Sequence, residues 1–350
     1  MSNDCHFFFA GNLCARFRGT VITIVSLTFA FNRQALPLQT DFYVAGAHCH
    51  LSTNSVDVLQ SVWRWRGPNL VGSRSLEMEI IVDPRLDTAA KRPAYFRGSG
   101  HLVFGFLPPG SFVIYDLLRK YVRAVLSTEA ARDDSFWKTL FIPITIGIVG
   151  TTVGVVPLHC ACLERNGNGL LIAGDSGAGK STLTAALTKR GLALISDDWT
   201  YFSKDQSTLV AHGLFSPIKL LPDAVQFFQE LRELRPAISL NGEIAYEVDP
   251  ARFVGSQVKN ASRPSWIFFL ERTSDPGCHF VCCPPASIRG FFEKNAERLP
   301  DELVDARAFR TTIIRTLSVL PSWILRTGES PQRTSEAIDH FILETKYATA

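Results

Sequence analysis

One eight-residue motif near the middle of the chain constrains its fold more than any other feature. Residues 174–181 read GDSGAGKS and fit the pattern G-x-x-x-x-G-K-[ST] at every fixed position. An apolar segment at 169–173 precedes the motif, residues 181–190 are mostly good helix formers, and Gly191 follows them. This order predicts a strand, a phosphate-binding loop and a helix that ends at a glycine cap.

The residue types in this motif suit a nucleotide. Successive backbone N–H groups of a glycine-rich loop can point inward at a phosphate, and the helix N-terminus that follows favours an anion. Lys180 would reach the β- and γ-phosphates, and the Ser181 hydroxyl would bind Mg²⁺. We therefore expect ATP and Mg²⁺ as cofactors. The expected cofactor-binding residues are Gly174, Asp175, Ser176, Gly177, Ala178, Gly179, Lys180, Ser181 and Thr182.

Two adjacent carboxylates follow the next predicted strand. Residues 192–196 are apolar and end in Asp197 and Asp198. Open α/β sheets bind ligands outside the carboxyl ends of their strands, so both acids are expected near the phosphate loop. One acid near Mg²⁺ serves any nucleotide hydrolase or kinase, and a second can face the acceptor. The alternative is an ordinary surface turn.

A histidine is also expected near the loop. Residues 157–163 and 169–173 look like short strands, and Asn166-Gly167 between them is a strong signal for a type I′ hairpin turn. With this turn, the residue numbers of each pair facing one another across the two strands add up to 333. His159 is therefore expected opposite Gly174. There His159 could orient a carboxylate base or accept a proton. The alternative is a hydrogen-bonded structural histidine.

The segment from Pro157 to Trp199 resembles the catalytic core of the HPr kinase/phosphorylase family, within the phosphoenolpyruvate carboxykinase-like kinases. The spacing of 21 residues from His159 to Lys180 and of 18 from Lys180 to Asp198 matches the pattern of that family. The resemblance implies that Lys180 binds phosphate and Ser181 binds Mg²⁺. It also implies that Asp198 accepts the proton of a hydroxyl substrate, that Asp197 is an auxiliary acid near the metal, and that His159 supports catalysis.

The chain departs from this family in one informative place. HPr kinases carry a glutamate-containing Arg-Gly signature after the aspartate pair, whereas this chain has Leu209-Val210-Ala211-His212-Gly213. The missing glutamate argues against HPr as the substrate and against a reverse phosphorylase reaction. The N-terminal region does not match either. The closer resemblance is to divergent HPr-kinase-related proteins, whose substrates are mostly unassigned.

A length of 350 residues allows one large domain or two ordinary ones. We expect an N-terminal extension at 1–35, a smaller α+β region at 36–130, and an α/β P-loop kinase domain of the phosphoenolpyruvate carboxykinase-like type, with a mixed sheet, at 131–346. Helices are predicted at 55–65 and 114–126 in the α+β region. Further along, the sequence predicts a hairpin around 241–242, strands at 266–270 and 280–283, and a closing helix at 335–343.

Charge and cysteine usage exclude several classes of function. The first 150 residues carry 15 Lys+Arg and 11 Asp+Glu and the rest 21 and 22, so no basic region suited to nucleic acid stands out. Eight cysteines are too dilute for a disulfide scaffold, and we expect a cytoplasmic protein.

Arg252, Lys259 and Arg263 are candidate cations for the phosphates or an anionic acceptor, with solvated surface charge as the alternative.

Neither a membrane nor a separate metal site is expected. The only membrane-like run covers residues 20–31, which is short of the roughly 20 residues that a spanning helix needs. A signal-peptide core is the alternative there, but no small-residue cleavage site follows. His48, Cys49 and His50 could suggest metal ligands, yet neighbouring residues on a strand point to opposite faces.

These features predict a kinase that uses ATP and Mg²⁺ to phosphorylate a hydroxyl, with Asp198, His159 and Lys180 as catalytic residues and Ser181 and Asp197 as metal ligands. The acceptor is a serine of a protein or peptide, or a small hydroxylated metabolite. A homo-oligomer is possible. The alternatives are a non-catalytic ATP-binding regulator and a P-loop ATPase, which would need a water-positioning residue and a sensing arginine that the sequence does not identify.

Overall fold

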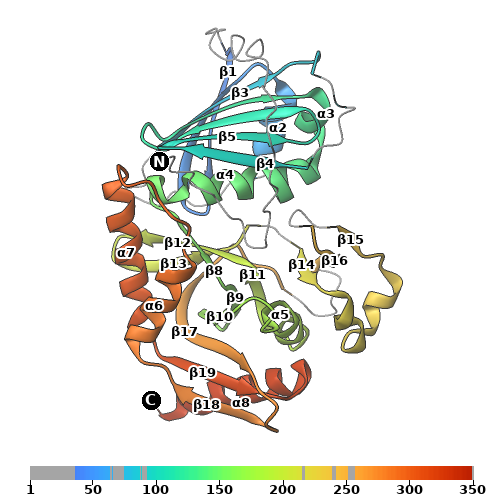
Figure 1. The fold of residues 1–350 in the computed structure, drawn as a ribbon, viewed down its shortest axis with the longest axis vertical. Coiled ribbons are helices and arrows are strands. Elements are labelled where there is room, and N and C mark those ends of the chain that lie inside the picture. The colour runs from blue at the N-terminus through green and yellow to red at the C-terminus, as the bar shows by residue number, and fades with distance from the viewer. Residues whose placement is uncertain are drawn as a thin grey trace, which may run out of the picture. The chain divides into compact units, whose positions relative to one another are not determined.

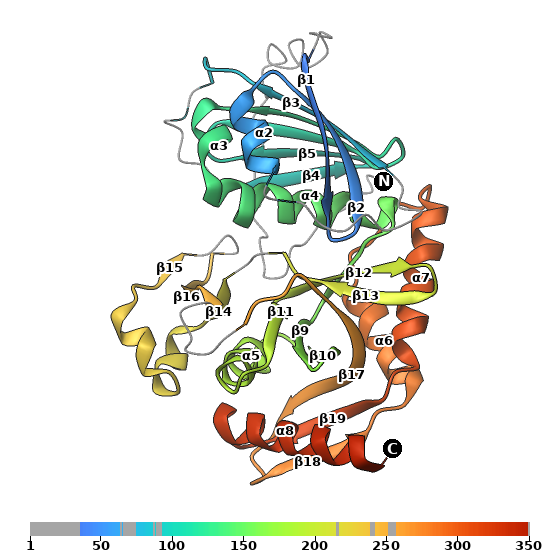
Figure 2. The same ribbon diagram turned by 180° about the vertical axis from the view of Figure 1, so that it is seen from behind.

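The computed structural model describes residues 36–63, 65, 75–86, 88, 93–214, 217–238, 242–250 and 257–348. The chain forms two compact units, drawn in Figures 1 and 2. The first unit contains residues up to Gly154 together with 240–243 and 297–307, and the second contains the rest. The sequence placed the boundary earlier, at 130–131. The expected extension at 1–35, with its apolar run, lies outside the described residues.

The first unit is built on a seven-stranded sheet with the order β1-β2-β3-β7-β6-β5-β4. Buried and partly exposed residues alternate along β2, so one face of the sheet meets the core and the other meets solvent. The strands are β1 Leu38–Val44, β2 Ala47–Thr53, β3 Ser75–Val82, β4 Tyr95–Ser99, β5 Leu102–Leu107, β6 Ser111–Asp116 and β7 Tyr121–Leu126. The helices are α2 Val56–Val62, α3 Thr128–Arg132 and α4 Ile142–Val149, with η2 Phe136–Phe141 and η3 Gly150–Val153 flanking α4.

One of the two helices predicted in this unit is present and the other is wrong. Helix α2 lies inside the predicted range 55–65. The predicted helix at 114–126 is instead the β6–β7 hairpin, in which Asp116 pairs with Tyr121 and Lys120 has a φ of 54°. Residues Tyr121–Leu126 alternate between partly buried and buried, which is a strand pattern that the apolar content of the segment had obscured.

In the first unit, helix α4 contacts the sheet at β6. The Tyr115 hydroxyl of β6 and the Thr145 hydroxyl of α4 lie 3.3 Å apart in a hydrogen bond. Within the described residues, Phe136–Val153 is long and apolar enough to cross a membrane, but 78% of this stretch is buried inside the protein. The run at 20–31 is therefore not the only membrane-like one. Burial on this scale is typical of a core helix.

The second unit contains a nine-stranded mixed sheet, which confirms the predicted α/β class with a mixed sheet. Its main order is β11-β9-β10-β17-β13-β12-β8, and β19 pairs with β17 and β18. Strands β10, β17 and β19 run parallel, whereas the other pairs are antiparallel. The strands are β8 Val156–His159, β9 Ala161–Arg165, β10 Asn168–Ala173, β11 Ala193–Ser196, β12 Trp199–Asp205, β13 Thr208–His212, β17 Ala261–Arg272, β18 Cys278–Cys282 and β19 Ser322–Thr327.

Helices cover both faces of this sheet because its central strands are apolar on both sides. On β10, Leu171 and Ala173 belong to a cluster with residues of α6 Pro285–Asn295 and α7 Val304–Ser318. Leu170 and Ile172 belong to another cluster, with residues of α5 Lys180–Lys189 and α8 Pro331–Ala348. Alternate side chains thus fill two cores, as expected for a strand buried on both faces.

A small three-stranded sheet with the order β14-β16-β15 completes the second unit. Its strands are β14 Ile218–Leu220, β15 Ala237–Ile238 and β16 Ile244–Val248, and two short 3₁₀ helices, η4 Pro222–Gln226 and η5 Gln229–Glu233, lie between β14 and β15. Ile218, Leu220 and Phe228 pack with residues of α5 in one apolar cluster. This packing ties the small sheet to the helix that follows the phosphate loop.

Several downstream predictions are confirmed and two helices were missed. Strand β17 contains the predicted strand at 266–270, and α8 contains the predicted helix at 335–343. Strand β18 covers most of the predicted strand at 280–283, and within the described residues it pairs with β19 alone, at the edge of the sheet. Strands β15 and β16 pair around the predicted hairpin, although Asn241 lies outside the described residues. Helices α6 and α7 have no counterpart in the sequence prediction.

Candidate functional site

The phosphate loop lies between the end of β10 at Ala173 and the start of α5 at Lys180, as the motif predicted. Gly179 directly before the helix has a φ of 93°, in the left-handed region that favours glycine. Gly174 is needed for a second reason, because a methyl group there would lie 2.8 Å from the Leu270 carbonyl oxygen of β17. The loop can therefore pack directly against the neighbouring strand.

Lys180 lies within the loop that it would serve. Its Nζ donates hydrogen bonds to the carbonyl oxygens of Gly174 at 2.9 Å and Asp175 at 3.1 Å, and the residue is only 8% exposed. Burial lowers the pKa of Lys180, and the nearby charges of Asp198 and Asp197 oppose that shift. The ammonium group is thus held against neutral acceptors, close to two acids and next to the helix N-terminus.

Asp197 is the buried acid of the pair, at 3% exposure. Its Oδ2 accepts a hydrogen bond from the Lys219 backbone N–H at 3.1 Å, whereas its buried Oδ1 has no well-formed hydrogen bond. Burial, and then the charge of Asp198, raise the pKa of Asp197 to about 7, and the nearby Ser181 hydroxyl works against this rise. A carboxylate oxygen without a partner beside a hydroxyl is an oxygen donor set that fits Mg²⁺.

Asp198 has a different environment. Its side chain is 45% exposed, and its Oδ1 lies 2.8 Å from His159 Nε2. Burial raises the pKa of Asp198, but the hydrogen bond and charge of His159, together with the charges of Lys219 and Lys180, outweigh this and lower it. Asp198 is therefore an ionised, accessible carboxylate, which is what a general base requires.

The predicted hairpin is correct, but it does not place His159. Asn166 and Gly167 have φ values of 52° and 82°, and the pairs from Asn168↔Arg165 to Ile172↔Ala161 all sum to 333. The first strand ends before this register reaches His159, because Cys160 separates β8 from β9. His159 instead pairs with Trp199 of β12, not with Gly174. The β8–β12 pairing brings its ring to Asp198, where Nε2 lies 2.8 Å from Oδ1.

The structure adds Lys219 and places two of the three candidate cations, Lys259 and Arg263, in other surroundings. Lys219 binds Asp197 through its backbone and influences Asp198 through its charge, although no motif marks a lysine 22 residues after Asp197. Lys259 forms an ion pair with Glu164, and Arg263 lies level with Asn168, at the end of β10 away from the loop. Arg252 lies outside the described residues.

The segment that replaces the glutamate signature supplies no acid to the site. His212 of β13 is buried, and its Nε2 lies 2.8 Å from the Ser203 hydroxyl. Burial lowers the pKa of His212 to about 4, so this histidine is neutral at physiological pH. The predicted Asp197 and Asp198 do lie close to Lys180 of the loop, and Asp197 lies beside Ser181.

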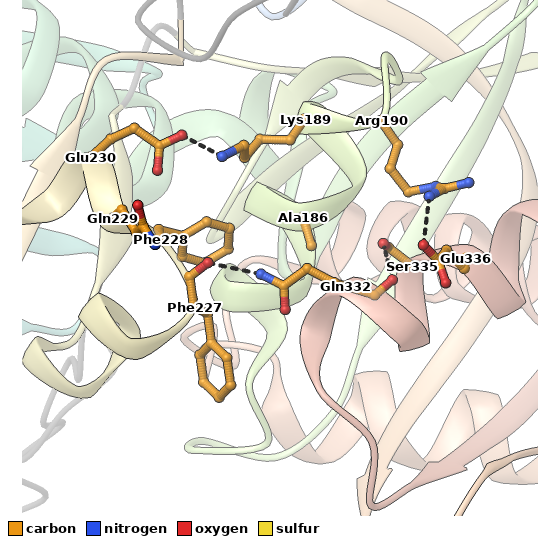
Figure 3. A pocket seen from close by; sticks show the side chains of 10 residues that line it. All are labelled: Ala186, Lys189, Arg190, Phe227, Phe228, Gln229, Glu230, Gln332, Ser335 and Glu336. Atoms are coloured by element: carbon orange, nitrogen blue, oxygen red, sulfur yellow. Dashed lines mark hydrogen bonds and ion pairs between the residues drawn. The ribbon is translucent and has the colours of Figure 1, made fainter.

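A cavity of about 520 Å³ opens at the other end of α5. Figure 3 shows the side chains that line it, among them Lys189 and Arg190. Its cations are already paired, Lys189 with Glu230 and Arg190 with Glu336. The phosphate loop precedes the first residue of α5, whereas these lysine and arginine residues are at its last turn, about 15 Å away for a ten-residue helix. We therefore do not assign the nucleotide phosphates to this cavity.

The unusual pKa of Asp197 gives the first testable prediction. A carboxyl whose pKa is raised in the folded chain, from 3.8 to about 7, binds its proton more tightly there than in the unfolded chain. The unfolding free energy of the metal-free protein should therefore fall as pH rises through this window, by up to about 1.4 kcal/mol per pH unit. Asp197→Asn should remove this part of the slope. Urea unfolding in EDTA at pH 5 and pH 7 measures it, and equal slopes in both proteins would contradict the assignment.

One known protein family matches part of this chain. Residues 154–217 match the family model described as the HPr Serine kinase C-terminal domain, and this range contains His159, the phosphate loop and both aspartates. The solved structure of the Hpr(Ser) kinase/phosphatase from Coxiella burnetii is similar, with 14% sequence identity and a TM-score of 0.31. That match covers 55% of this chain and 94% of that chain. No curated protein matches the sequence.

Proposed function

We propose, on the premise that residues 154–217 are HPr-kinase-like, that the second unit is a P-loop kinase domain of the phosphoenolpyruvate carboxykinase-like type. It transfers the γ-phosphoryl group of ATP to a hydroxyl. The observation that carries the proposal is the contact between Asp198 and His159 at 2.8 Å, beside a complete phosphate loop. A protein that only binds ATP needs no ionised, accessible second carboxylate.

The proposed mechanism is a direct in-line transfer. Backbone N–H groups of the loop and Lys180 hold the β- and γ-phosphates, and Ser181 and Asp197 would hold Mg²⁺, which neutralises phosphate charge when bound. The acceptor oxygen forms a bond to the γ-phosphorus. At the same time the bond between the γ-phosphorus and the oxygen that bridges it to the β-phosphate breaks, and ADP leaves with that oxygen. The hydroxyl proton passes to the Asp198 carboxylate, which His159 holds in place.

The nature of the acceptor stays open between two classes. A serine of a protein or peptide and a small hydroxylated metabolite both present the hydroxyl that this mechanism needs. The segment that carries a glutamate in the HPr kinase signature has Val210 and Ala211 in this chain. The missing glutamate argues against HPr as the protein substrate. The cysteines of the described residues are all free, which suits the cytoplasmic setting that we propose.

The test is to identify the phosphorylated product directly. Lysate of the host, freed of ATP, is incubated with purified protein and γ-labelled ATP, and labelled peptides and metabolites are identified by mass spectrometry. We expect at least one labelled hydroxyl compound with the wild type and none with Asp198→Asn as the matched control. Label that appears only in free phosphate would favour the ATPase alternative. Binding of ATP without any labelled product would favour the regulator.

His159 provides a second prediction for this function. His159→Ala should lower kcat for phosphoryl transfer far more than it changes KM for ATP, since His159 is hydrogen-bonded to the proposed base. Because the hydrogen bond from His159 lowers the pKa of Asp198, the acidic limb of the pH–rate profile should also move to higher pH. An unchanged kcat and pH profile would make His159 a purely structural residue.

A further inference from the structure

Arg272 is the last residue of β17, and its guanidinium lies beside Gly179 of the phosphate loop. Strands β10 and β17 are parallel, and Ala173 at the end of β10 pairs with Phe269. Parallel strands end at the same edge of a sheet, so the three residues after Phe269 extend β17 alongside the loop. Gly179 confirms the proximity: a methyl group built on it would lie 3.6 Å from both Nε and Nη2 of Arg272.

The Arg272 guanidinium is held by a neutral group. Its Nη1 donates a hydrogen bond of 2.9 Å to the backbone carbonyl of Glu329. The neighbouring exposed carboxylate, Glu271, is engaged by Arg326 at 3.0 Å, and Glu329 Oε1 accepts from the Gly277 backbone N–H. A carbonyl fixes the direction of a guanidinium without neutralising it, so Arg272 keeps its full charge and its remaining donors.

Position and charge together indicate an anionic partner. Gly179 directly precedes Lys180 and the first turn of α5, where the loop N–H groups and the helix dipole already favour phosphate. A planar guanidinium can bind two phosphate oxygens through two parallel N–H groups, a fixed geometry that an ammonium group lacks. No sequence motif marks this arginine, because it lies 92 residues after Lys180 and meets the loop only through the β10–β17 pairing.

We propose that Arg272 binds the β- and γ-phosphates of the nucleotide, as an arginine supplied by the same chain. The inference rests on the proposed function and assigns to it a second phosphate-binding cation besides Lys180. Such an arginine stabilises negative charge that develops on the phosphoryl group during transfer.

Calorimetry with Mg-ATP, Mg-ADP and AMP on the full chain tests the proposal. Arg272→Ala should weaken ATP binding by at least about tenfold, weaken ADP binding less, and leave AMP binding unchanged. Arg272→Lys should fall between the wild type and Arg272→Ala, since it keeps the charge but not the bidentate geometry. The matched control is Arg263→Ala, an exposed arginine near the opposite end of the same strand, which should change ATP affinity less than about twofold.

The outcomes separate this inference from the proposed function. If the wild type binds ATP and Arg272→Ala binds it within about twofold of the wild type while remaining folded by circular dichroism, the role of Arg272 is wrong and the kinase proposal stands. Equal losses for ATP and AMP would also overturn it, because the contact would then not involve the β- and γ-phosphates. A wild type that does not bind ATP would overturn both.

Discussion

Replacing Asp198 with asparagine should leave ATP binding within about twofold of the wild type and lower the rate of phosphoryl transfer on the order of 10²–10⁴-fold, the usual contribution of a general base. The reason is the division of roles between the two acids. Asp197 is buried beside Ser181. Asp198 is ionised, its side chain is 45% exposed, and it is hydrogen-bonded to His159. Asparagine keeps the size of the side chain but cannot accept the hydroxyl proton.

Two measurements on the same preparation check this expectation. Calorimetry with Mg-ATP gives the affinity, and transfer of labelled phosphate to the acceptor found in lysate gives the rate. Asp205→Asn, at the far end of β12, is the matched control and should alter neither. Parallel losses of affinity and rate would make Asp198 a metal ligand. Full activity in Asp198→Asn would remove this residue from the mechanism.

Replacing Lys180 with alanine should abolish measurable ATP binding. The ammonium group is the buried cation of the loop, and it also donates to the carbonyl oxygens of Gly174 and Asp175. The variant therefore loses both the charge for the phosphates and two hydrogen bonds that hold the loop. Calorimetry should show no saturable binding at concentrations that saturate the wild type.

The control for this variant lies on the same helix. Lys189 is at the opposite end of α5, where it pairs with Glu230, so Lys189→Ala should bind ATP like the wild type. Thermal unfolding of both variants shows whether each is folded. If folded Lys180→Ala binds ATP within about twofold of the wild type, a difference of only ~0.4 kcal/mol, the assignment of the phosphate loop is wrong.

Features that depend on neighbouring residues were predictable from the sequence. The phosphate loop follows from its glycines, and the hairpin register follows from Asn166-Gly167, because positive φ values restrict the chain within two or three residues. The failed helix at 114–126 shows the limit of such reasoning. Its apolar residues suit either a buried helix or a strand, and only pairing with β3 and β5 in the sheet selects the strands.

Three properties of the candidate site were decided only by the tertiary structure. His159 meets Asp198 because β8 pairs with β12, and Arg272 meets the loop because β17 runs parallel to β10. Burial then separates two adjacent aspartates into a protonatable acid and an ionised one. The sequence by itself determined the residue types and the local turns, since these depend on short-range sterics and hydrogen bonding. The distances between residues far apart in the chain, and the pKa values, depend on strand pairing and on exclusion of water, which exist only once the sheet has formed.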